Sequence, residues 1–463
     1  MSDRLSSGHP RLDEVLGGGL PANAINLLIG LPGSGKTILA QQYVFANATA
    51  ERPALYLSTV SEPLEKMLRY GQTLEFFDAE AVGRAVFYED LAGVLNDRGL
   101  DGVSERIGDL LRERRPSIIV IDSFKALSAY ADGTGFRRFL HVIAGRLSAF
   151  PVSCFWVGEY AEREIAEAPE FAVADAVIAL STTRAGEREA RAVRILKLRG
   201  SRAASGEHAY RISARGIDVF PRLADPADVS SYAVGDQRLS SGIAALDEIL
   251  AEGYWQGAST LCAGPSGCGK TLMGMHFIFN GARNGEPGVI AAFQENPIQL
   301  ERIVGAFGWS IEEPAVEVMY RSPVDVYIDE WVYELLARIA RTGAKRVLID
   351  SLTDLQFASA DAVRFREFMY SLVQRLSRDG VSLFMTSELP DLFTVTRLSE
   401  FGVSHVADNV IVLQYVRDHS AVGRALIVLK TRASRHRPQI LEFKITDQGI
   451  VLGAPLGDAV PDA

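Results

Sequence analysis

The sequence predicts an α/β fold in two tandem domains, each a mainly parallel twisted sheet flanked by helices. The chain has 463 residues, enough for two domains of roughly 230 residues each. Residues 30–37 read GLPGSGKT and residues 264–271 read GPSGCGKT, so one pattern, GxxxxGK[ST], occurs twice. Each half also has apolar runs that close on an acidic residue, which is typical of strands buried on both faces of a parallel sheet.

The two halves are a tandem repeat with an offset of 234 residues between the matching loops. At this offset residues 12–14 fall on residues 246–248, and both read LDE. Unrelated residue types that stay in register indicate duplication of a whole domain. We therefore predict one domain over residues 1–228 and a second over residues 229–463, with the boundary in the segment 221–236.

Each half repeats one order of elements. Apolar strands over residues 25–29 and 259–263 lead into the two loops, and a helix begins at the Lys-Thr pair of each loop. In the first half the helix KTILAQQYVFANA has apolar residues at helical spacing, and a strand follows over residues 54–60. Further on, the strands SIIVID and RVLID end in Asp122 and Asp350. This order predicts βαβ units in both halves.

The repeated loop indicates nucleotide binding. GxxxxGK[ST] wraps backbone N–H groups around phosphates, with its Lys on the outer phosphates. Two such loops, each between a strand and a helix, are hard to obtain by chance. The predicted contacts are Gly30, Gly33, Ser34, Gly35, Lys36 and Thr37 in the first half and Gly264, Gly267, Cys268, Gly269, Lys270 and Thr271 in the second.

A Mg²⁺ ion is expected beside each loop. Thr37 and Thr271 supply the hydroxyl that this loop places on Mg²⁺. Asp122 and Asp350 end strands at the sheet edge where α/β proteins bind ligands, and we expect them to hold Mg²⁺ through water. A helix cap is the alternative role for Asp122 taken alone.

Phosphoryl transfer also needs a residue that orients or deprotonates the attacking group. In the second half Gln294 and Glu295 follow the strand after the loop helix, and we expect Glu295 to be catalytic. The matching pair in the first half is Val60-Ser61, and Glu62 lies one residue further on. Because strand residues alternate in direction, Glu62 can serve only if the strand has already ended there. A solvated acid at a strand end is the alternative for both glutamates, and the two sites are predicted to be unequal.

Late in each half a strand carries alternating cations, Lys197 with Arg199 and Lys430 with Arg432. Alternation predicts that each pair lies on one face, where a solvated strand edge is the commoner explanation. Recurrence in both halves favours contact with the γ-phosphate of a neighbouring subunit. Ser201, which follows the first pair, is placed in the same group.

From about Ser7 to Gly453 the chain resembles the two-domain KaiC-type proteins of the RecA-like P-loop ATPases. The likeness is carried by the doubled loop, the opening SGxxxLDxxLxxG, the Asp-Ser strand ends, QENPIQL, DNVIVLQY, KLRG and KTRA. The resemblance implies a homohexamer of two stacked rings, with ATP at the subunit interfaces and the strand-borne Lys and Arg reaching the next subunit's site.

The resemblance also implies that the second domain transfers phosphate to its own Ser-Thr pair. Here Ser404 stands at the first acceptor position and His405 replaces the second. The family has adjacent glutamates where this chain has Gln294 and Glu295. Because a Gln cannot take a proton, this departure bears on the autokinase step more than on hydrolysis.

The leading hypothesis is a homohexameric ATPase that acts as a signalling switch on partner proteins that the sequence does not define. The alternatives are a RecA-like DNA-dependent ATPase and a non-hydrolysing scaffold held together by ATP. A net charge of −10 provides no positive field to attract DNA. No apolar segment follows basic residues at the N-terminus, and no apolar run approaches the ~18 residues of a spanning helix, so we expect a cytoplasmic protein without a membrane partner.

Overall fold

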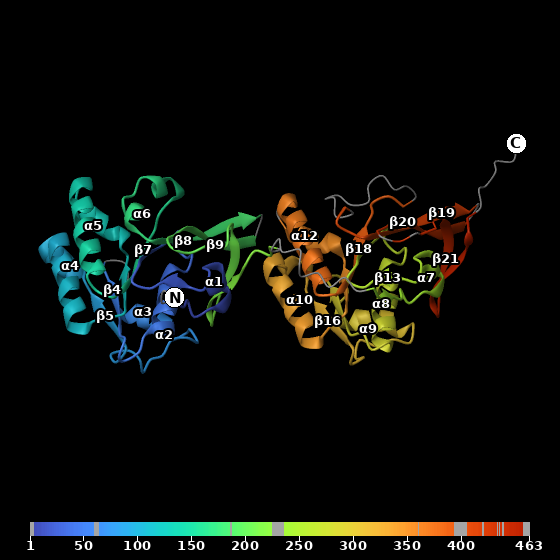
Figure 1. The fold of residues 1–463 in the computed structure, drawn as a ribbon, viewed down its shortest axis with the longest axis horizontal. Helices are drawn as coiled ribbons and strands as arrows, with labels where there is room; N and C mark the ends of the chain where they lie inside the picture. The colour runs from blue at the N-terminus through green and yellow to red at the C-terminus, as the bar shows by residue number, and fades with distance from the viewer. Residues whose placement is uncertain are drawn as a thin grey trace. The chain divides into compact units, whose positions relative to one another are not determined.

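The chain divides into two compact units in the computed structural model, Met1–Arg222 and Leu223–Ala463 (Figure 1). The structure describes residues 4–59, 64–185, 188–224, 236–359, 361–392, 405–418, 421–432, 434, 436–437 and 439–456. The division between the units falls inside the segment 221–236, where the sequence predicts the domain boundary.

The first unit contains one nine-stranded sheet. The strands of this sheet are β3 Ile25–Gly30, β4 Ala54–Ser58, β5 Val86–Asp90, β6 Ile118–Asp122, β7 Ser153–Gly158, β8 Ala176–Ala185, β9 Arg188–Leu198, β10 His208–Ser213 and β11 Gly216–Phe220. Two short strands, β1 Arg4–Leu5 and β2 Leu20–Pro21, form a separate pair. The order across the sheet is β11-β10-β9-β8-β3-β7-β6-β4-β5. Neighbours from β8 to β5 are parallel, whereas β8 to β11 form antiparallel pairs.

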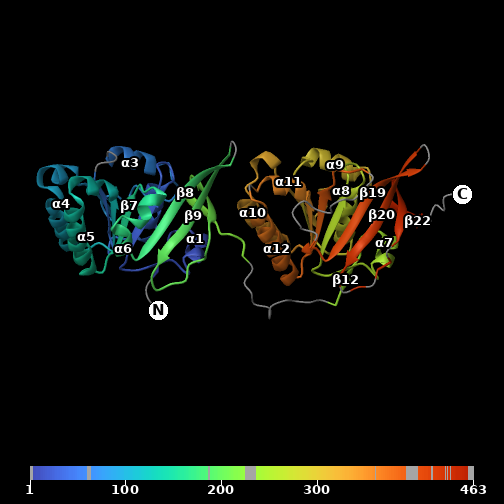
Figure 2. The ribbon, with the colours of Figure 1, turned by 90° about the horizontal axis from the view of Figure 1, so that it is seen from above.

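Helices cover both faces of this sheet. They are α1 Pro10–Val15, α2 Lys36–Asn47, α3 Leu64–Gly71, α4 Ala92–Arg114, α5 Gly133–Ser148 and α6 Glu170–Val173, with 3-10 turns η1 Lys125–Tyr130 and η2 Glu162–Ala166. Strand β6 contacts the helices on both faces, because successive residues of a strand point to opposite faces of the sheet. Ile118 and Val120 pack with residues of α1, α2 and α3, while Ile119 and Ile121 pack with residues of α4 and α5. Figures 1 and 2 show α4 and α5 side by side.

The second unit repeats this sheet. The strands of the second sheet are β14 Ser259–Gly264, β15 Gly288–Ala292, β16 Val316–Tyr320, β17 Arg346–Asp350, β18 Ser382–Glu388, β19 Asn409–Asp418, β20 Ala421–Thr431, β21 Ile440–Thr446 and β22 Gly449–Pro455. Two short strands, β12 Arg238–Leu239 and β13 Tyr254–Trp255, form a separate pair. The order β16-β15-β17-β18-β14-β19-β20-β21-β22 matches the first sheet strand for strand. Strands β16 to β19 are parallel to their neighbours, and β19 to β22 form antiparallel pairs.

The helices of the second unit are arranged in the same way. They are α7 Ala244–Ile249, α8 Lys270–Arg283, α9 Pro297–Gly305, α10 Ile328–Thr342, α11 Leu352–Phe357 and α12 Ala362–Arg378, with the 3-10 turn η4 Pro323–Asp325. One core lies between the sheet and α10, α11 and α12, and the other between the sheet and α7, α8 and α9. Figure 2 shows α10 and α12 side by side. The predicted α/β class, two tandem domains with mainly parallel sheets and flanking helices, is confirmed.

The prediction for the cation-bearing strands needs one correction. Strand β9 ends at Leu198 and β20 at Thr431, so Arg199 and Arg432 lie beyond the strands instead of alternating within them. In the first unit the chain turns at once, because Gly200 has a φ of 70°, which ends the extended conformation.

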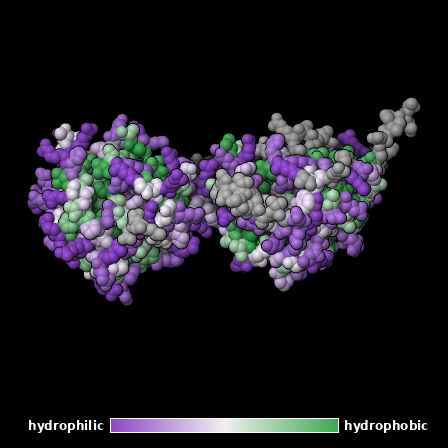
Figure 3. Space-filling model, viewed as in Figure 1, coloured by the Kyte–Doolittle hydropathy of each residue, from purple (hydrophilic) through white to green (hydrophobic). Residues whose placement is uncertain are grey.

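On the face drawn in Figure 3, hydrophilic residues dominate both units and hydrophobic residues are scattered among them. Among the described helices, none is both long enough and apolar enough to cross a bilayer.

Candidate nucleotide-binding sites

Both predicted loops connect a buried parallel strand to a helix. The first runs from the end of β3 to Lys36, and the second from the end of β14 to Lys270. Gly35 and Gly269 precede the two helices with φ values of 89° and 111°, a left-handed conformation that strains any residue with a Cβ atom. Glycine at these positions therefore lets each chain turn directly from loop into helix.

The loop lysines fold across their own loops. Lys36 Nζ donates to the carbonyl oxygen of Leu31 at 2.9 Å, and Lys270 Nζ donates to that of Pro265 at 2.8 Å. Burial lowers the pKa of the Lys36 amino group. The hydroxyl of Ser34 is buried and has no hydrogen-bond partner among the described residues. Donors held at the centre of such a loop suit an anionic ligand with several oxygens.

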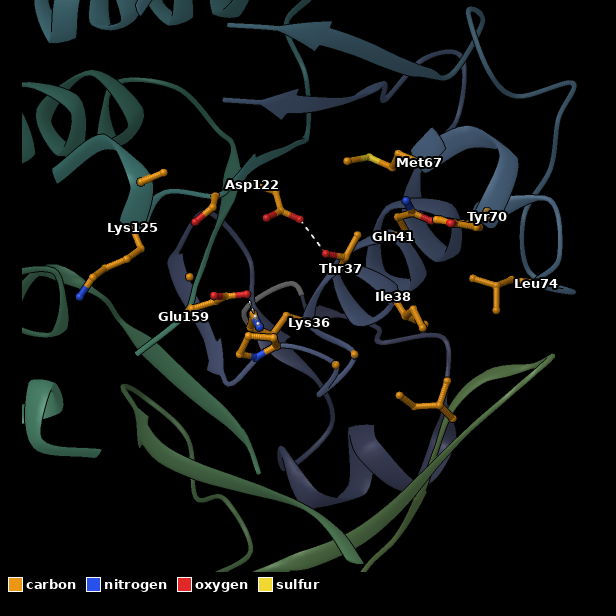
Figure 4. Close-up of a pocket in the computed structure, with 18 of the residues that line it drawn as sticks. Lys36, Thr37, Ile38, Gln41, Met67, Tyr70, Leu74, Asp122, Lys125 and Glu159 are labelled. Carbon is orange, nitrogen blue, oxygen red and sulfur yellow. Dashed lines mark hydrogen bonds and ion pairs between the residues drawn. The ribbon is translucent and has the colours of Figure 1, made fainter. Parts of the chain in front are cut away.

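The predicted Thr-Asp pairs come together in both units. Thr37 Oγ1 donates to Asp122 Oδ2 at 2.9 Å (Figure 4), and Tyr56 OH donates to the same oxygen at 2.8 Å. In the second unit Asp350 accepts from Thr386 and also interacts with the Thr271 hydroxyl. Burial raises the pKa of Asp350.

The first loop opens into a cavity of about 880 Å³. Figure 4 draws Lys36, Asp122 and Glu159 on one side of it and Tyr70 and Leu74 on the other. The lining residues include Pro32, Gly33, Gly35, Lys36, Thr37, Ile38, Gln41, Met67, Tyr70, Leu74, Asp122, Ser123, Lys125, Glu159 and Ile212. The cavity therefore has a polar end at the loop and an apolar end at α3.

The second loop opens into a smaller cavity of about 340 Å³. Its lining is Ser266, Gly267, Gly269, Lys270, Thr271, Leu272, Gln294, Glu295, Ile303, Phe307, Asp350, Ser351, Glu388 and Ile445. Gln294 and Glu295 thus face the same space as the loop lysine. They lie two and three residues beyond the end of β15.

Acidic groups surround Glu295. Burial raises its pKa, and the negative charges of Asp350 and Asp354 raise it further. Gln294 Nε2 donates to both carboxylate oxygens of Asp354, each at 3.0 Å. A carboxylate whose pKa is raised is a better proton acceptor near neutral pH, as a general base requires.

The first cavity contains an acid that was not predicted. Glu159, directly after β7, places its Oε1 atom 3.7 Å from Lys36 Nζ. Glu388 ends the matching strand β18 and lines the second cavity. The signal was present in the sequence, since the segments VGE and TSE close matching strands beside the loop strand.

The cation pairs bind their own units. Lys197 Nζ donates to the carbonyl oxygen of Phe171 at 3.0 Å, and Lys430 Nζ donates to that of Ala407 at 2.6 Å. The remaining contacts of this group are Arg199 to Asp175 at 3.2 Å, Arg432 to Asp408 at 3.5 Å, and Ser201 to the carbonyl oxygen of Leu16 at 3.3 Å. None of the five lines the cavity of its own unit among the residues described there.

Two predicted residues, Glu62 and Ser404, lie outside the described residues. Cys268, predicted in the second loop, is buried, and burial raises the pKa of its thiol.

The residues present fit a nucleoside triphosphate with Mg²⁺. In each unit a helix begins at a Gly-Lys-Thr loop, a lysine crosses that loop, and a Thr-Asp pair stands beside it. The buried hydroxyl of Ser34 could also donate to an oxygen of an anionic ligand. The fold and these two loops define a P-loop nucleoside triphosphatase with two tandem repeats.

The model of the KaiC ATPase family matches residues 5–224 and residues 239–456. The chain therefore belongs to the KaiC family of RecA-like P-loop ATPases, as the resemblance implied. Membership in this ATPase family implies that the chain binds ATP.

Similar proteins cover nearly the whole chain. Circadian clock protein KaiC3 of Synechocystis sp. is 30% identical over an alignment of 474 residues, gaps included, which covers 98% of this chain and 92% of the relative. Circadian clock oscillator protein KaiC of Rippkaea orientalis is 28% identical over 457 residues, 94% of this chain and 86% of the relative. The protein of the same name from Thermostichus vulcanus is 29% identical over 455 residues, with the same two coverages.

Proposed function

We propose that the chain is an ATP-hydrolysing homohexameric double ring that acts as a signalling switch. In this proposal residues 1–228 form an N-terminal ATPase domain and residues 229–463 form a C-terminal domain with ATPase and serine autokinase activity. The single observation that carries it is the second cavity, where Lys270, Asp350 and Glu295 face one space. The names of the relatives support a signalling role, since they are circadian clock proteins.

In the second domain, Lys270 would leave the carbonyl oxygen of Pro265 and bind the outer phosphates of ATP. Thr271, and Asp350 through water, would hold Mg²⁺, which neutralises phosphate charge when bound. Glu295 would take the proton of the attacking water, because its raised pKa suits a base.

The first domain would bind ATP in the same way, through Lys36, Thr37 and Asp122. Its acids are different, because Glu159 pairs with Lys36 and Val60-Ser61 replaces Gln294-Glu295. We propose Glu62 as its acid, and the two sites as unequal in chemistry.

The cation pairs would act in trans. The side chains of Arg199 and Arg432 are 60% and 56% exposed, so a neighbouring subunit can reach them. Lys197 and Lys430 each lie two residues before these arginines, and Ser201 lies two residues after Arg199. We include all three in the trans contact. Closure of a ring around these contacts would place ATP at each subunit interface.

The proposal is tested by phosphate release from Mg²⁺ and ATP. We expect Glu295→Gln to lower turnover on the order of 100-fold at the second site, because it removes the base and keeps the shape. Unchanged steady release in Glu295→Gln would contradict the assigned base, and no release from the unsubstituted chain would favour the scaffold. Turnover that DNA stimulates, with affinity that falls steeply as salt rises, would favour a DNA-dependent ATPase.

The autokinase activity has a separate test. Incubation with Mg²⁺ and ATP is expected to raise the intact mass by one phosphate, of about 80 Da, and Ser404→Ala is expected to abolish the increase. An increase that persists in Ser404→Ala would exclude this acceptor. ATP consumption without any increase in mass would leave nucleotide state alone as the signal.

A further inference from the structure

The amide of Gln294 has a fixed orientation. Its Nε2 atom donates to both carboxylate oxygens of Asp354 at 3.0 Å. An ionised carboxylate only accepts hydrogen bonds, so the NH₂ group and not the carbonyl oxygen must face Asp354. The carbonyl Oε1 of Gln294, a residue that lines the second cavity, is therefore left to accept a hydrogen bond from a donor there.

Asp354 is itself held firmly. It lies in α11, is only 7% exposed, and accepts from Ser351 Oγ at 2.6 Å. No cation among the described residues forms an ion pair with it. A buried carboxylate that relies on neutral donors is costly, so it needs those donors in place. Gln294 and Asp354 thus stabilise each other's orientation.

The first repeat lacks both members of this pair. Asp122 and Asp350 end matching strands, and the residue four positions further on is Ala126 in the first repeat but Asp354 in the second. The residue that matches Gln294 is Val60. The carboxylate and the amide occur together or not at all.

We propose that Asp354 is a positioning residue that orients Gln294 toward the attacking water in the second site. This inference rests on the proposed function, hydrolysis with Glu295 as the base. The water donates one hydrogen bond to Gln294 Oε1 and the other to Glu295. The oxygen of the water forms a bond to the γ-phosphorus, and Glu295 takes one proton of the water. The bond between the γ-phosphorus and the β–γ bridging oxygen breaks, and the electron pair of that bond leaves with ADP.

The first test compares Asp354→Asn with the unsubstituted chain. Asparagine keeps the size of the side chain but can donate, so it no longer fixes the Gln294 amide. The second-site rate is defined as the turnover that Glu295→Gln removes. We expect Asp354→Asn to lower the kcat of that component on the order of tenfold, as expected for one misplaced hydrogen bond, and to leave the Kd of a fluorescent ATP analogue unchanged.

The second test exchanges the two groups. Gln294→Glu alone places two carboxylates in contact and should lower turnover. The double variant Gln294→Glu/Asp354→Ala removes the clash and should recover at least part of the rate, which makes the two substitutions non-additive. Losses that simply add would overturn the inference.

Asp329→Asn is the matched control. Asp329 is also buried, but it lies in α10 and pairs with Arg364, so its substitution should lower stability without changing kcat. A kcat loss in this control equal to that of Asp354→Asn would reduce Asp354 to a structural residue and overturn the inference. If Glu295→Gln leaves turnover intact, the proposed base and the inference both fail. If Glu295→Gln removes turnover and Asp354→Asn does not, the inference alone fails.

Discussion

Lys36 and Lys270 occupy matching positions in the two loops, yet different acids surround them. Glu159 lies 3.7 Å from the Lys36 amino group, on a side chain that is 56% exposed. Near Lys270, the half-buried Glu295 stands close to Asp350 and Asp354, and its pKa is raised. The two loop lysines therefore have different acidic neighbours, the exposed Glu159 for Lys36 and the half-buried Glu295 for Lys270.

His276 in α8 makes the stability of the second unit depend on pH. It accepts from Ile450 N at 3.0 Å through Nε2, and burial lowers its pKa to about 4. The unfolded chain, with an ordinary His pKa of about 6.5, takes up a proton between these values that the folded unit does not. Stability should therefore fall as pH falls from about 6.5 to about 4, by up to about 3 kcal/mol.

Urea unfolding at about pH 7 and about pH 5 measures this dependence. His276→Gln serves as the control, since an amide can accept the Ile450 hydrogen bond but does not titrate in this range. The unsubstituted chain should lose more stability on acidification than the variant. Parallel losses in the two proteins would show that His276 is not the cause.

At the scale of elements, α9 links chain stability to the second cavity. Asn296 caps α9 by accepting from Gln299 N at 3.0 Å, and the Gln299 side chain accepts from Asn296 N at 3.1 Å. Ile303 in this helix and Phe307 just beyond it line the cavity. The cap residue Asn296 directly follows Glu295, so it also fixes where the loop of Gln294 and Glu295 ends.

Asn296→Ala should loosen the first turn of α9 at a cost of about 1 kcal/mol. Hydrogen exchange of the α9 amides is the measurement, with faster exchange expected in the variant. Asn296→Asp retains an oxygen that can cap the helix and should keep most of the protection. Equal protection in all three proteins would contradict a role for the cap.

The elements were largely predictable from the sequence, because their signals are local. Glycine, lysine and threonine at fixed spacing define each loop, and apolar runs that end in Asp122 and Asp350 define buried strands. Contacts between distant residues were predictable where a motif supplies both partners, as for Thr37 and Asp122, but not elsewhere. Gln294 meets Asp354 only because β15 and β17 are neighbours in the sheet. The buried Arg346 also lies in a run predicted to be apolar, and its Nη1 atom donates to the carbonyl oxygen of Phe277 at 2.7 Å.

At the scale of the whole molecule, one architecture occurs twice with different sites. The two sheets have the same strand order, and both loops lie at the same place in it. The cavities measure about 880 and about 340 Å³, and their acids differ. Both repeats keep the Gly-Lys-Thr loop and the strand order, whereas differences such as Val60 against Gln294 give the two sites different side chains.

The central claim is that the two nucleotide sites are unequal, and it is tested most directly with Lys36→Ala and Lys270→Ala side by side. Phosphate release is measured on samples whose assembly mass is determined in the presence of ATP. We expect the two variants to differ in both quantities, with Lys270→Ala losing the turnover that depends on Glu295 and Lys36→Ala retaining it. Equal effects of the two substitutions on assembly and on turnover would contradict the account.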